Sequence, residues 1–95
     1  MIYRYRPEME SSVYIDWRKK ILKRDGFACQ MPRCKVRKRL QVHHIVPWSE
    51  SANLRYETSN GVTLCYNCHK EVTKKEGSYV GLFSSTVYEN EKNNS

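Results

Sequence analysis

Two closely spaced cysteine pairs constrain this chain more than any other feature of its sequence. Four residues separate Cys29 from Cys34, and two residues separate Cys65 from Cys68. Each pair lets two thiolates converge on one ion, and two pairs complete the tetrahedral shell of a structural zinc site. In a secreted chain the same cysteines would instead form two disulfides, so the interpretation depends on the compartment.

Chain length and the N-terminal sequence favour the metal. Ninety-five residues make one small domain, and a core of that size gives marginal stability without a further staple. Residues 1–10 carry no apolar run typical of a secretion signal, and no segment is long enough to span a membrane. We therefore expect a cytoplasmic protein with reduced thiols. The structural Zn²⁺ would be held by Cys29, Cys34, Cys65 and Cys68.

The positive charge of the chain is concentrated in one window. The formal net charge is +7, and between residues 18 and 39 ten Lys and Arg residues are opposed only by Asp25. Four thiolates and one Zn²⁺ would lower the net charge, yet the chain would stay basic. Such a window indicates a polyanionic partner, most simply nucleic acid, or else a solvated basic face.

Helical spacing is clearest before the first cysteine pair. Residues 12–24 predict a helix, because Val13, Trp17 and Ile21 recur every four residues and share one face. Gly26 suits the left-handed position that follows a helix. Trp17 is expected in the core.

The segment between and after the cysteine pairs predicts two strands and a helix. Residues 40–43 alternate between two faces, and residues 62–64 form a second strand that could pair with them antiparallel. Asn60-Gly61 predicts a turn just before the second strand. A short helix is expected from residue 67 to about residue 75, with Gly77 as its stop.

These elements divide the chain into three parts. Residues 1–10 form an N-terminal arm, residues 11–77 the domain that holds the cysteines, and residues 78–95 a C-terminal extension. Apolar residues in the extension either pack back on the domain or contact a partner. The polar stretch from residue 89 to residue 95 is expected to be disordered.

Three histidines lie close to the cysteines along the chain. His43 and His44 are neighbours on the first predicted strand, so their side chains project to opposite sides, and His69 directly follows the second pair. One histidine could bind a second metal while another, neutral near pH 7, abstracts a proton. Each could also be a satisfied core or surface histidine. Their grouping with Asn60 and four cysteines favours a site, but leaves the roles of His43 and His44 open.

Residues 40–47 and 60–69 closely resemble the HNH endonuclease family. The first segment reads Leu-Gln-Val-His-His-Ile-Val-Pro, and the second reads Asn-Gly-Val-Thr-Leu-Cys-Tyr-Asn-Cys-His. Residues 17–29, Trp-Arg-x-x-Ile-Leu-x-Arg-Asp-Gly-x-x-Cys, resemble the segment that leads into the first cysteine pair. The resemblance covers residues 16–70 and is strongest to the compact, cysteine-bearing members often encoded by phages.

The resemblance implies a small α+β, zinc-stabilised fold, with a ββα-metal (His-Me finger) core and an N-terminal helix. By correspondence of motifs, His43 and His69 are ligands of a catalytic divalent ion, and His44 is the general base that activates water. Asn60 is the middle residue of the motif, which orients the base loop. We expect it to hold His44 in place by hydrogen bonding.

The implied activity is metal-dependent DNA endonuclease activity that leaves 5′-phosphate and 3′-hydroxyl ends. We expect nicking with low sequence specificity, because the chain offers one site and no evident base-reading helix. The alternative is a non-catalytic, zinc-stabilised DNA-binding or accessory module of phage packaging or recombination machinery. The expected partners are double-stranded DNA and a terminase-like or other phage protein, with no membrane, in the host cytoplasm if a phage encodes the chain.

One departure from the family bears on the catalytic metal. Some members carry another histidine four residues after the helical one, where this chain has Thr73. Water and phosphate oxygens would then complete the shell, which favours Mg²⁺ or Mn²⁺, although Ni²⁺, Co²⁺ and Zn²⁺ also suit imidazole. Arg55 and Lys70 could clamp phosphate near this site or remain solvated.

Overall fold

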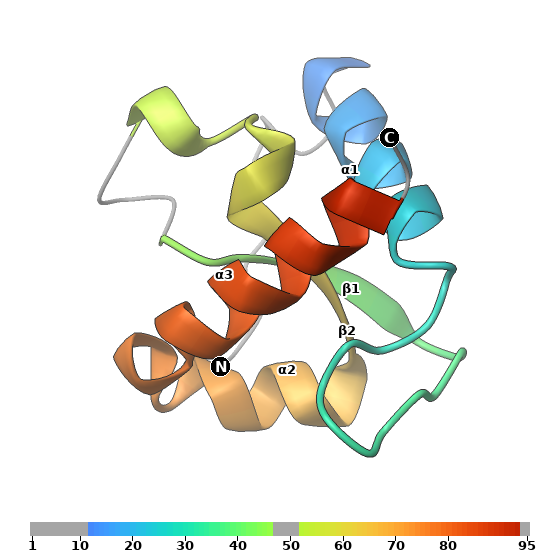
Figure 1. Cartoon of the computed structure of the whole chain (residues 1–95), viewed down its shortest axis with the longest axis vertical. Helices are drawn as coiled ribbons and strands as arrows, with labels where there is room; N and C mark the ends of the chain where they lie inside the picture. The colour runs from blue at the N-terminus through green and yellow to red at the C-terminus, as the bar shows by residue number, and fades with distance from the viewer. Residues whose placement is uncertain (1–11, 47–51, 94–95) are drawn as a thin grey trace.

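The computed structural model describes residues 12–46 and 52–93. Within them a small α+β fold runs in the order α1 (Ser12–Arg24), β1 (Leu40–His44), β2 (Gly61–Cys65), α2 (Tyr66–Thr73) and α3 (Glu76–Asn93) (Figure 1). The α+β class is as predicted. The predicted arm at residues 1–10 lies outside the described residues. No helix in the described part of the chain is long and apolar enough to cross a membrane.

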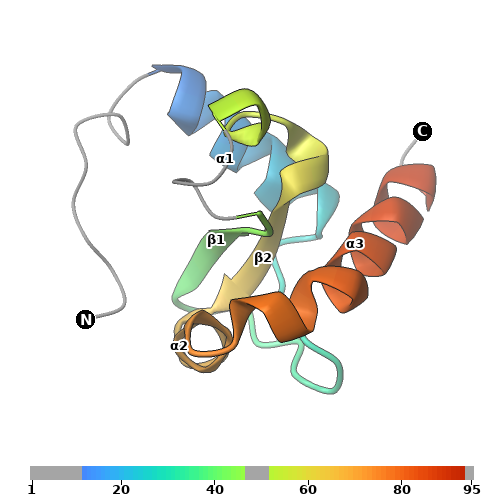
Figure 2. The ribbon, with the colours of Figure 1, turned by 90° about the vertical axis from the view of Figure 1, so that its left-hand side faces the viewer.

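The two strands pair antiparallel and separate the helices into two layers. Leu40 lies opposite Cys65, and His44 lies opposite Gly61. In Figure 2, α1 lies on one side of the sheet and α2 on the other. This arrangement lets a two-stranded sheet, which is only marginally stable alone, bury both of its faces.

Each face of the sheet has its own apolar cluster. The cluster on the α1 side contains Trp17, Ile21, Leu22 and Val42. The cluster on the α2 and α3 side contains Cys29, Ile45, Val62, Leu64, Cys65, Val72, Phe83 and Val87. Trp17 is in the core as predicted, but Val13 on the same predicted face is 54% exposed. Only the C-terminal part of α1 therefore covers the sheet.

Gly61 begins β2, and its N–H closes the 3-10 turn that precedes the strand. The turn predicted at Asn60-Gly61 is confirmed as the short 3-10 helix Thr58–Asn60, whose last hydrogen bond runs from the N–H of Gly61 to the carbonyl of Thr58. It is not a two-residue hairpin turn, because Gly61 is extended (φ −130°, ψ 147°) and already belongs to β2. A Cβ on Gly61 would lie 2.2 Å from Cδ1 of Ile21 and 2.7 Å from Cζ2 of Trp17. The glycine is needed because α1 packs directly against the strand backbone.

The C-terminal extension forms the helix α3 and completes the core. Phe83 and Val87 are buried in the cluster on the α2 side, so the extension packs back on the domain. Gly77 lies in the first turn of α3, just beyond the end of α2 at Thr73. The disorder predicted from residue 89 onward is wrong as far as Asn93, because α3 continues to that residue.

Candidate metal centre and histidine site

The four cysteines converge as their spacing predicted. Cys29 and Cys34 lie in the loop after α1, Cys65 ends β2, and Cys68 lies in the first turn of α2. Their sulfur atoms all lie within 4.8 Å of one another, and no disulfide joins them. The Sγ atoms of Cys34 and Cys65 are 3.8 Å apart, about the spacing of two ligands on a tetrahedral zinc. The four thiols could therefore hold one metal ion.

The protonation of these thiols depends on their shared surroundings. Burial raises the pKa of Cys29 and of Cys68. Burial also acts to raise the pKa of Cys65, but hydrogen bonds from Cys68 and the other thiols outweigh it, and the net shift is downward. Metal binding would displace the remaining thiol protons, so affinity for the ion should fall in acid.

His43 and His69 meet on the α2 side of the sheet. Their ring centroids are 5.3 Å apart in an edge-to-face arrangement, and the ring of Phe83 lies 5.7 Å from that of His43. Burial, with repulsion from the other two histidines, lowers the pKa of His43 to about 3, and burial also lowers the pKa of His69. Both rings are therefore neutral near pH 7, the form in which imidazole binds a metal.

Gln41 joins this histidine pair, a role that the sequence reasoning missed. It lies two residues before His43 on β1, and its amide oxygen contacts Nδ1 of His69. The alternation of β1 already placed Gln41 and His43 on one face. What the alternation could not supply was the position of α2, which brings His69 onto that face.

Thr73 does not replace the third histidine that some family members carry. Its hydroxyl donates to the backbone carbonyl of His69 at 2.7 Å, within α2. Bonds of this kind, from a side chain to the carbonyl four residues earlier, are common for threonine in helices. The two imidazoles of His43 and His69 are therefore the histidine rings that meet on this side of the sheet.

His44 projects to the opposite side of β1, as predicted. Its ring stacks on Trp17 with the centroids 4.3 Å apart, and its Nε2 lies 3.0 Å from the carbonyl oxygen of Arg55. A carbonyl oxygen can only accept a hydrogen bond, so Nε2 carries the hydrogen. In the neutral ring the basic nitrogen is then Nδ1. This tautomer is suited to taking a proton at Nδ1.

Asn60 is buried and connects two loops near His44. Its Oδ1 accepts from the backbone N–H of Val46 at 2.8 Å, and its Nδ2 donates to the carbonyls of Val46 and Leu54, each at 3.2 Å. Among the described residues the amide thus bonds to backbone, whereas a bond to His44 was expected. Because Leu54 precedes Arg55, Asn60 bonds to the same loop that supplies the Arg55 carbonyl to His44.

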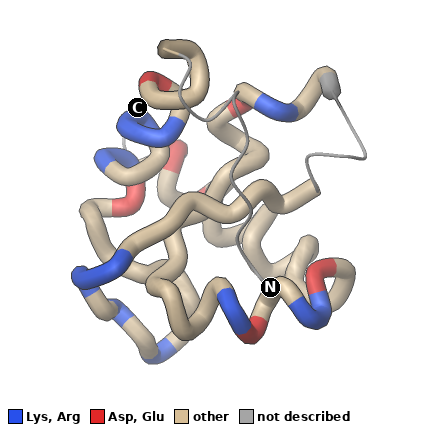
Figure 3. The backbone as a smooth tube through the Cα atoms, turned by 180° about the vertical axis from the view of Figure 1, so that it is seen from behind, with Lys and Arg blue, Asp and Glu red and all other residues tan. Residues whose placement is uncertain are grey.

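The basic window of the sequence divides into exposed and buried parts. Arg33, Lys35, Arg37, Lys38 and Arg39 are exposed on the loop between α1 and β1. Figure 3 shows these blue segments along one edge of the molecule. Arg33, Lys35 and Arg39 have positive φ angles of 69°, 59° and 54°, a conformation that favours glycine or asparagine. Their charges are therefore carried by a loop with an unusual, defined backbone.

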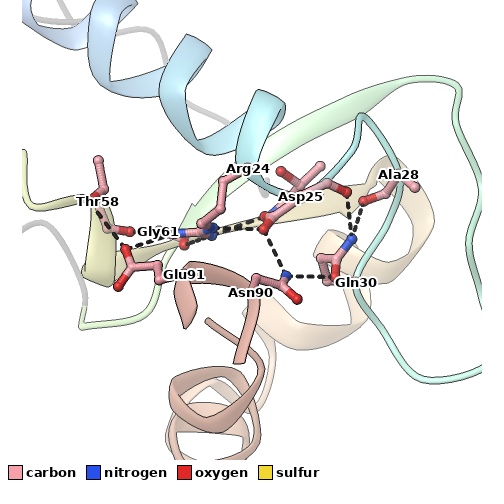
Figure 4. A network of polar contacts seen from close by, with 9 residues as sticks. Arg24, Asp25, Ala28, Gln30, Thr58, Gly61, Asn90 and Glu91 are labelled. Atoms are coloured by element: carbon pink, nitrogen blue, oxygen red, sulfur yellow. Dashed lines mark hydrogen bonds and ion pairs between the residues drawn. The ribbon is translucent and has the colours of Figure 1, made fainter. Parts of the chain in front are cut away.

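The side chain of Arg24 is buried, unlike the other basic residues of this window described above. It forms an ion pair with Asp25 (Nε to Oδ1, 2.8 Å) and donates to the carbonyls of Thr58 and Gly61, each at 2.7 Å (Figure 4). Those two carbonyls flank Asn60 in the sequence. Arg24 thus helps to position the segment that carries Asn60 instead of facing solvent.

The outer edge of β2 is covered by the same polar network. The backbone N–H of Thr63 donates to Asp25 at 2.9 Å, and its carbonyl accepts from the backbone N–H of Gln30 at 2.9 Å. From α3, Asn90 donates to Asp25 at 2.9 Å and to Gln30 at 3.0 Å. The network satisfies a strand edge that would otherwise invite pairing with another chain.

Comparison with known proteins matches the chain to a family. The family model described as HNH endonuclease matches residues 29–75. The matched segment contains both cysteine pairs, the three histidines and Asn60. No curated protein and no solved structure matches the chain.

Proposed function

We propose, from the premise that residues 29–75 of this chain belong to the HNH endonuclease family, that the protein is a metal-dependent endonuclease acting on double-stranded DNA. The observation that carries the proposal is the placement of the histidines on β1. His43 meets His69 on one side of the strand, and His44 is held by the Arg55 carbonyl on the other. The two candidate metal ligands therefore lie on one side of β1, and the candidate base, which is the next residue after His43, lies on the other.

His43 and His69 are the residues that would hold the catalytic ion. Both are neutral near pH 7, and their rings are already adjacent. Two imidazoles leave room for water and phosphate oxygens, which suits Mg²⁺ or Mn²⁺, while Ni²⁺, Co²⁺ and Zn²⁺ remain candidates. A divalent cation bound there supplies positive charge for the scissile phosphate and for the departing 3′ oxygen.

His44 is the proposed general base. The hydrogen bond from Nε2 to the Arg55 carbonyl and the stacking on Trp17 hold the ring in one orientation. Nδ1 would take a proton from the attacking water, and the resulting imidazolium would keep its bond to the carbonyl. The bond from the water oxygen to phosphorus replaces the bond to the 3′ oxygen, which takes a proton from solvent, so the products carry 5′-phosphate and 3′-hydroxyl ends. Asn60 would keep the Arg55 loop in place.

The four cysteines would hold a structural Zn²⁺ that joins the loop after α1 to β2 and α2.

One monomer offers one set of catalytic side chains, so the proposed product on duplex DNA is a nick. Exposed Lys and Arg on the loop between α1 and β1 would contact phosphates, which carry little sequence information. Weak sequence preference follows. The proposed protein partner is a terminase or another phage protein, which would bring the nuclease to its DNA target.

A supercoiled-plasmid assay tests the proposal. Zinc-loaded wild type, His44→Ala, His69→Ala and the exposed-site control Asn67→Ala are compared in Mg²⁺, Mn²⁺, Ni²⁺, Co²⁺ and Zn²⁺. We expect His44→Ala to lower the nicking rate about 10²–10⁴-fold while retaining metal binding, whereas His69→Ala loses both. Full nicking by His44→Ala would exclude it as the base. DNA binding by wild type without nicking in any metal would favour the non-catalytic alternative.

A further inference from the structure

We infer that Gln41 is a positioning residue of the catalytic metal site, which fixes the ring of His69 so that Nε2 faces the ion. The inference rests on the proposed role of His69 as a ligand. Its structural basis is the contact between the amide oxygen of Gln41 and Nδ1 of His69.

The fold explains why this contact forms. Gln41 pairs with Leu64 in the sheet, and α2 begins at Tyr66 directly after β2. The first turn of α2 therefore carries His69 back over β1. Because side chains two residues apart share a face of a strand, Gln41 and His43 both meet His69 there.

The chemistry of the amide selects one tautomer of His69. An amide oxygen only accepts hydrogen bonds, so Nδ1 must carry the hydrogen. In the neutral ring the lone pair that can bind a metal is then on Nε2. Histidine ligands generally donate their second ring N–H to an acceptor in this way, which fixes both tautomer and ring orientation.

No other described side chain performs this role for His69. The hydroxyl of Thr73 bonds to the backbone carbonyl of His69, not to the ring. The rings of His43 and His69 meet edge to face. The proposed site has two imidazole ligands, so the loss of the Gln41 amide oxygen would leave one of the two without the group that orients its ring. Loss of such an acceptor typically costs 10–100-fold in metal affinity.

The experiment has two readouts that do not depend on nuclease activity. The ¹⁵N chemical shifts of His69 in the zinc-loaded protein, without other divalent ions, report which ring nitrogen carries the hydrogen. Electron paramagnetic resonance titration with Mn²⁺ alone gives the affinity of the second site. The variants are Gln41→Leu, which keeps size without an acceptor, Gln41→Glu, which keeps the acceptor, and Asn67→Ala as an exposed control on α2.

We expect His69 to be protonated at Nδ1 in wild type and in Gln41→Glu, and to lose this preference in Gln41→Leu. The Mn²⁺ affinity should fall 10–100-fold in Gln41→Leu and stay within a few-fold of wild type in the other two variants. A hydrogen on Nε2 of His69 in wild type, or unchanged Mn²⁺ affinity in Gln41→Leu, would overturn the inference. Absence of Mn²⁺ binding by wild type would instead overturn the proposed metal site, while the nitrogen shifts would still decide the Gln41 contact.

Discussion

At the scale of single residues, the burial of His43 has the clearest thermodynamic consequence. The residue is 3% exposed, and burial, with repulsion from His69 and His44, lowers its pKa from 6.5 to about 3. The unfolded chain therefore takes up a proton in this pH range that the folded chain does not. The stability contributed by the neutral ring is fully present above pH 6.5 and is lost as the pH falls toward 3, by about 1.4 kcal/mol per pH unit.

This dependence can be measured against a variant that lacks the titrating group. The free energy of unfolding of zinc-loaded wild type should fall by about 1.4 kcal/mol more than that of His43→Leu between about pH 7.5 and pH 5.5. Urea denaturation at the two pH values gives both numbers. Loss of zinc from the thiolates in acid affects both proteins alike and cancels in the comparison. Equal losses in the two proteins would contradict a neutral, buried His43.

At the scale of secondary-structure elements, one ion pair holds three of them together. Arg24 and Asp25 at the end of α1 bond to the backbone on either side of Asn60 and to the outer edge of β2. Asn90 and Glu91 from α3 contact the same pair. The carboxylate of Asp25 is fully buried, so removal of its cationic partner would leave a charge without compensation.

We expect Arg24→Gln to lower the free energy of unfolding by about 3–5 kcal/mol, the usual cost of removing one partner of a buried ion pair. Lys23→Gln, on an exposed neighbour in the same turn, should change it by less than about 0.5 kcal/mol. The double variant Arg24→Gln with Asp25→Asn should be less destabilised than the sum of its single variants. Denaturant titration of these three variants and of Asp25→Asn, each against wild type, measures the changes. An unchanged free energy of unfolding in Arg24→Gln would contradict a stabilising role of the ion pair.

At the scale of the whole molecule, the net charge of +7 is less informative than its distribution. Arg24 is withdrawn into the interior, while the loop over residues 33–39 presents its basic side chains to solvent. No carboxylate among the described residues forms an ion pair with Lys35 or Lys38. This loop, like the exposed Lys19, Lys20 and Lys23 on α1, therefore presents positive charge to solvent that DNA phosphates could neutralise.

The double variant Lys35→Gln with Lys38→Gln should weaken duplex binding and its dependence on salt. Each lost phosphate contact lowers the slope of log K against log salt by about 0.9, so the slope should become shallower by about 2. The matched double variant Lys74→Gln with Lys75→Gln removes the same charge from the end of α2 and should leave the slope unchanged. Fluorescence anisotropy with a labelled duplex measures both. Equal changes in the two variants would mean that net charge alone sets the affinity.

Much of the candidate site could be predicted from local patterns. Two cysteine pairs at short spacing indicated one cluster, and the sulfur atoms of Cys34 and Cys65 do lie 3.8 Å apart. Alternation along β1 indicated that His43 and His44 point to opposite sides, as they do. These features depend only on the geometry of neighbouring residues, which the order of amino acids determines directly.

Other features depended on packing between distant segments, and the sequence alone could not supply them. Asn60-Gly61 predicted the turn before β2, but only the packing of Trp17 and Ile21 against the strand explains why residue 61 must be glycine. Arg24 belongs to a run of basic residues and would be expected at the surface, yet its side chain is buried in an ion pair with Asp25.

The sequence by itself therefore determined the cysteine cluster and the division of the adjacent histidines between two faces. The tertiary structure alone decided what each histidine meets: Gln41 for His69, Phe83 for His43, and Trp17 with the Arg55 carbonyl for His44. The physical reason is that these contacts form only when helices from both ends of the chain pack on the sheet, and no local spacing specifies that packing.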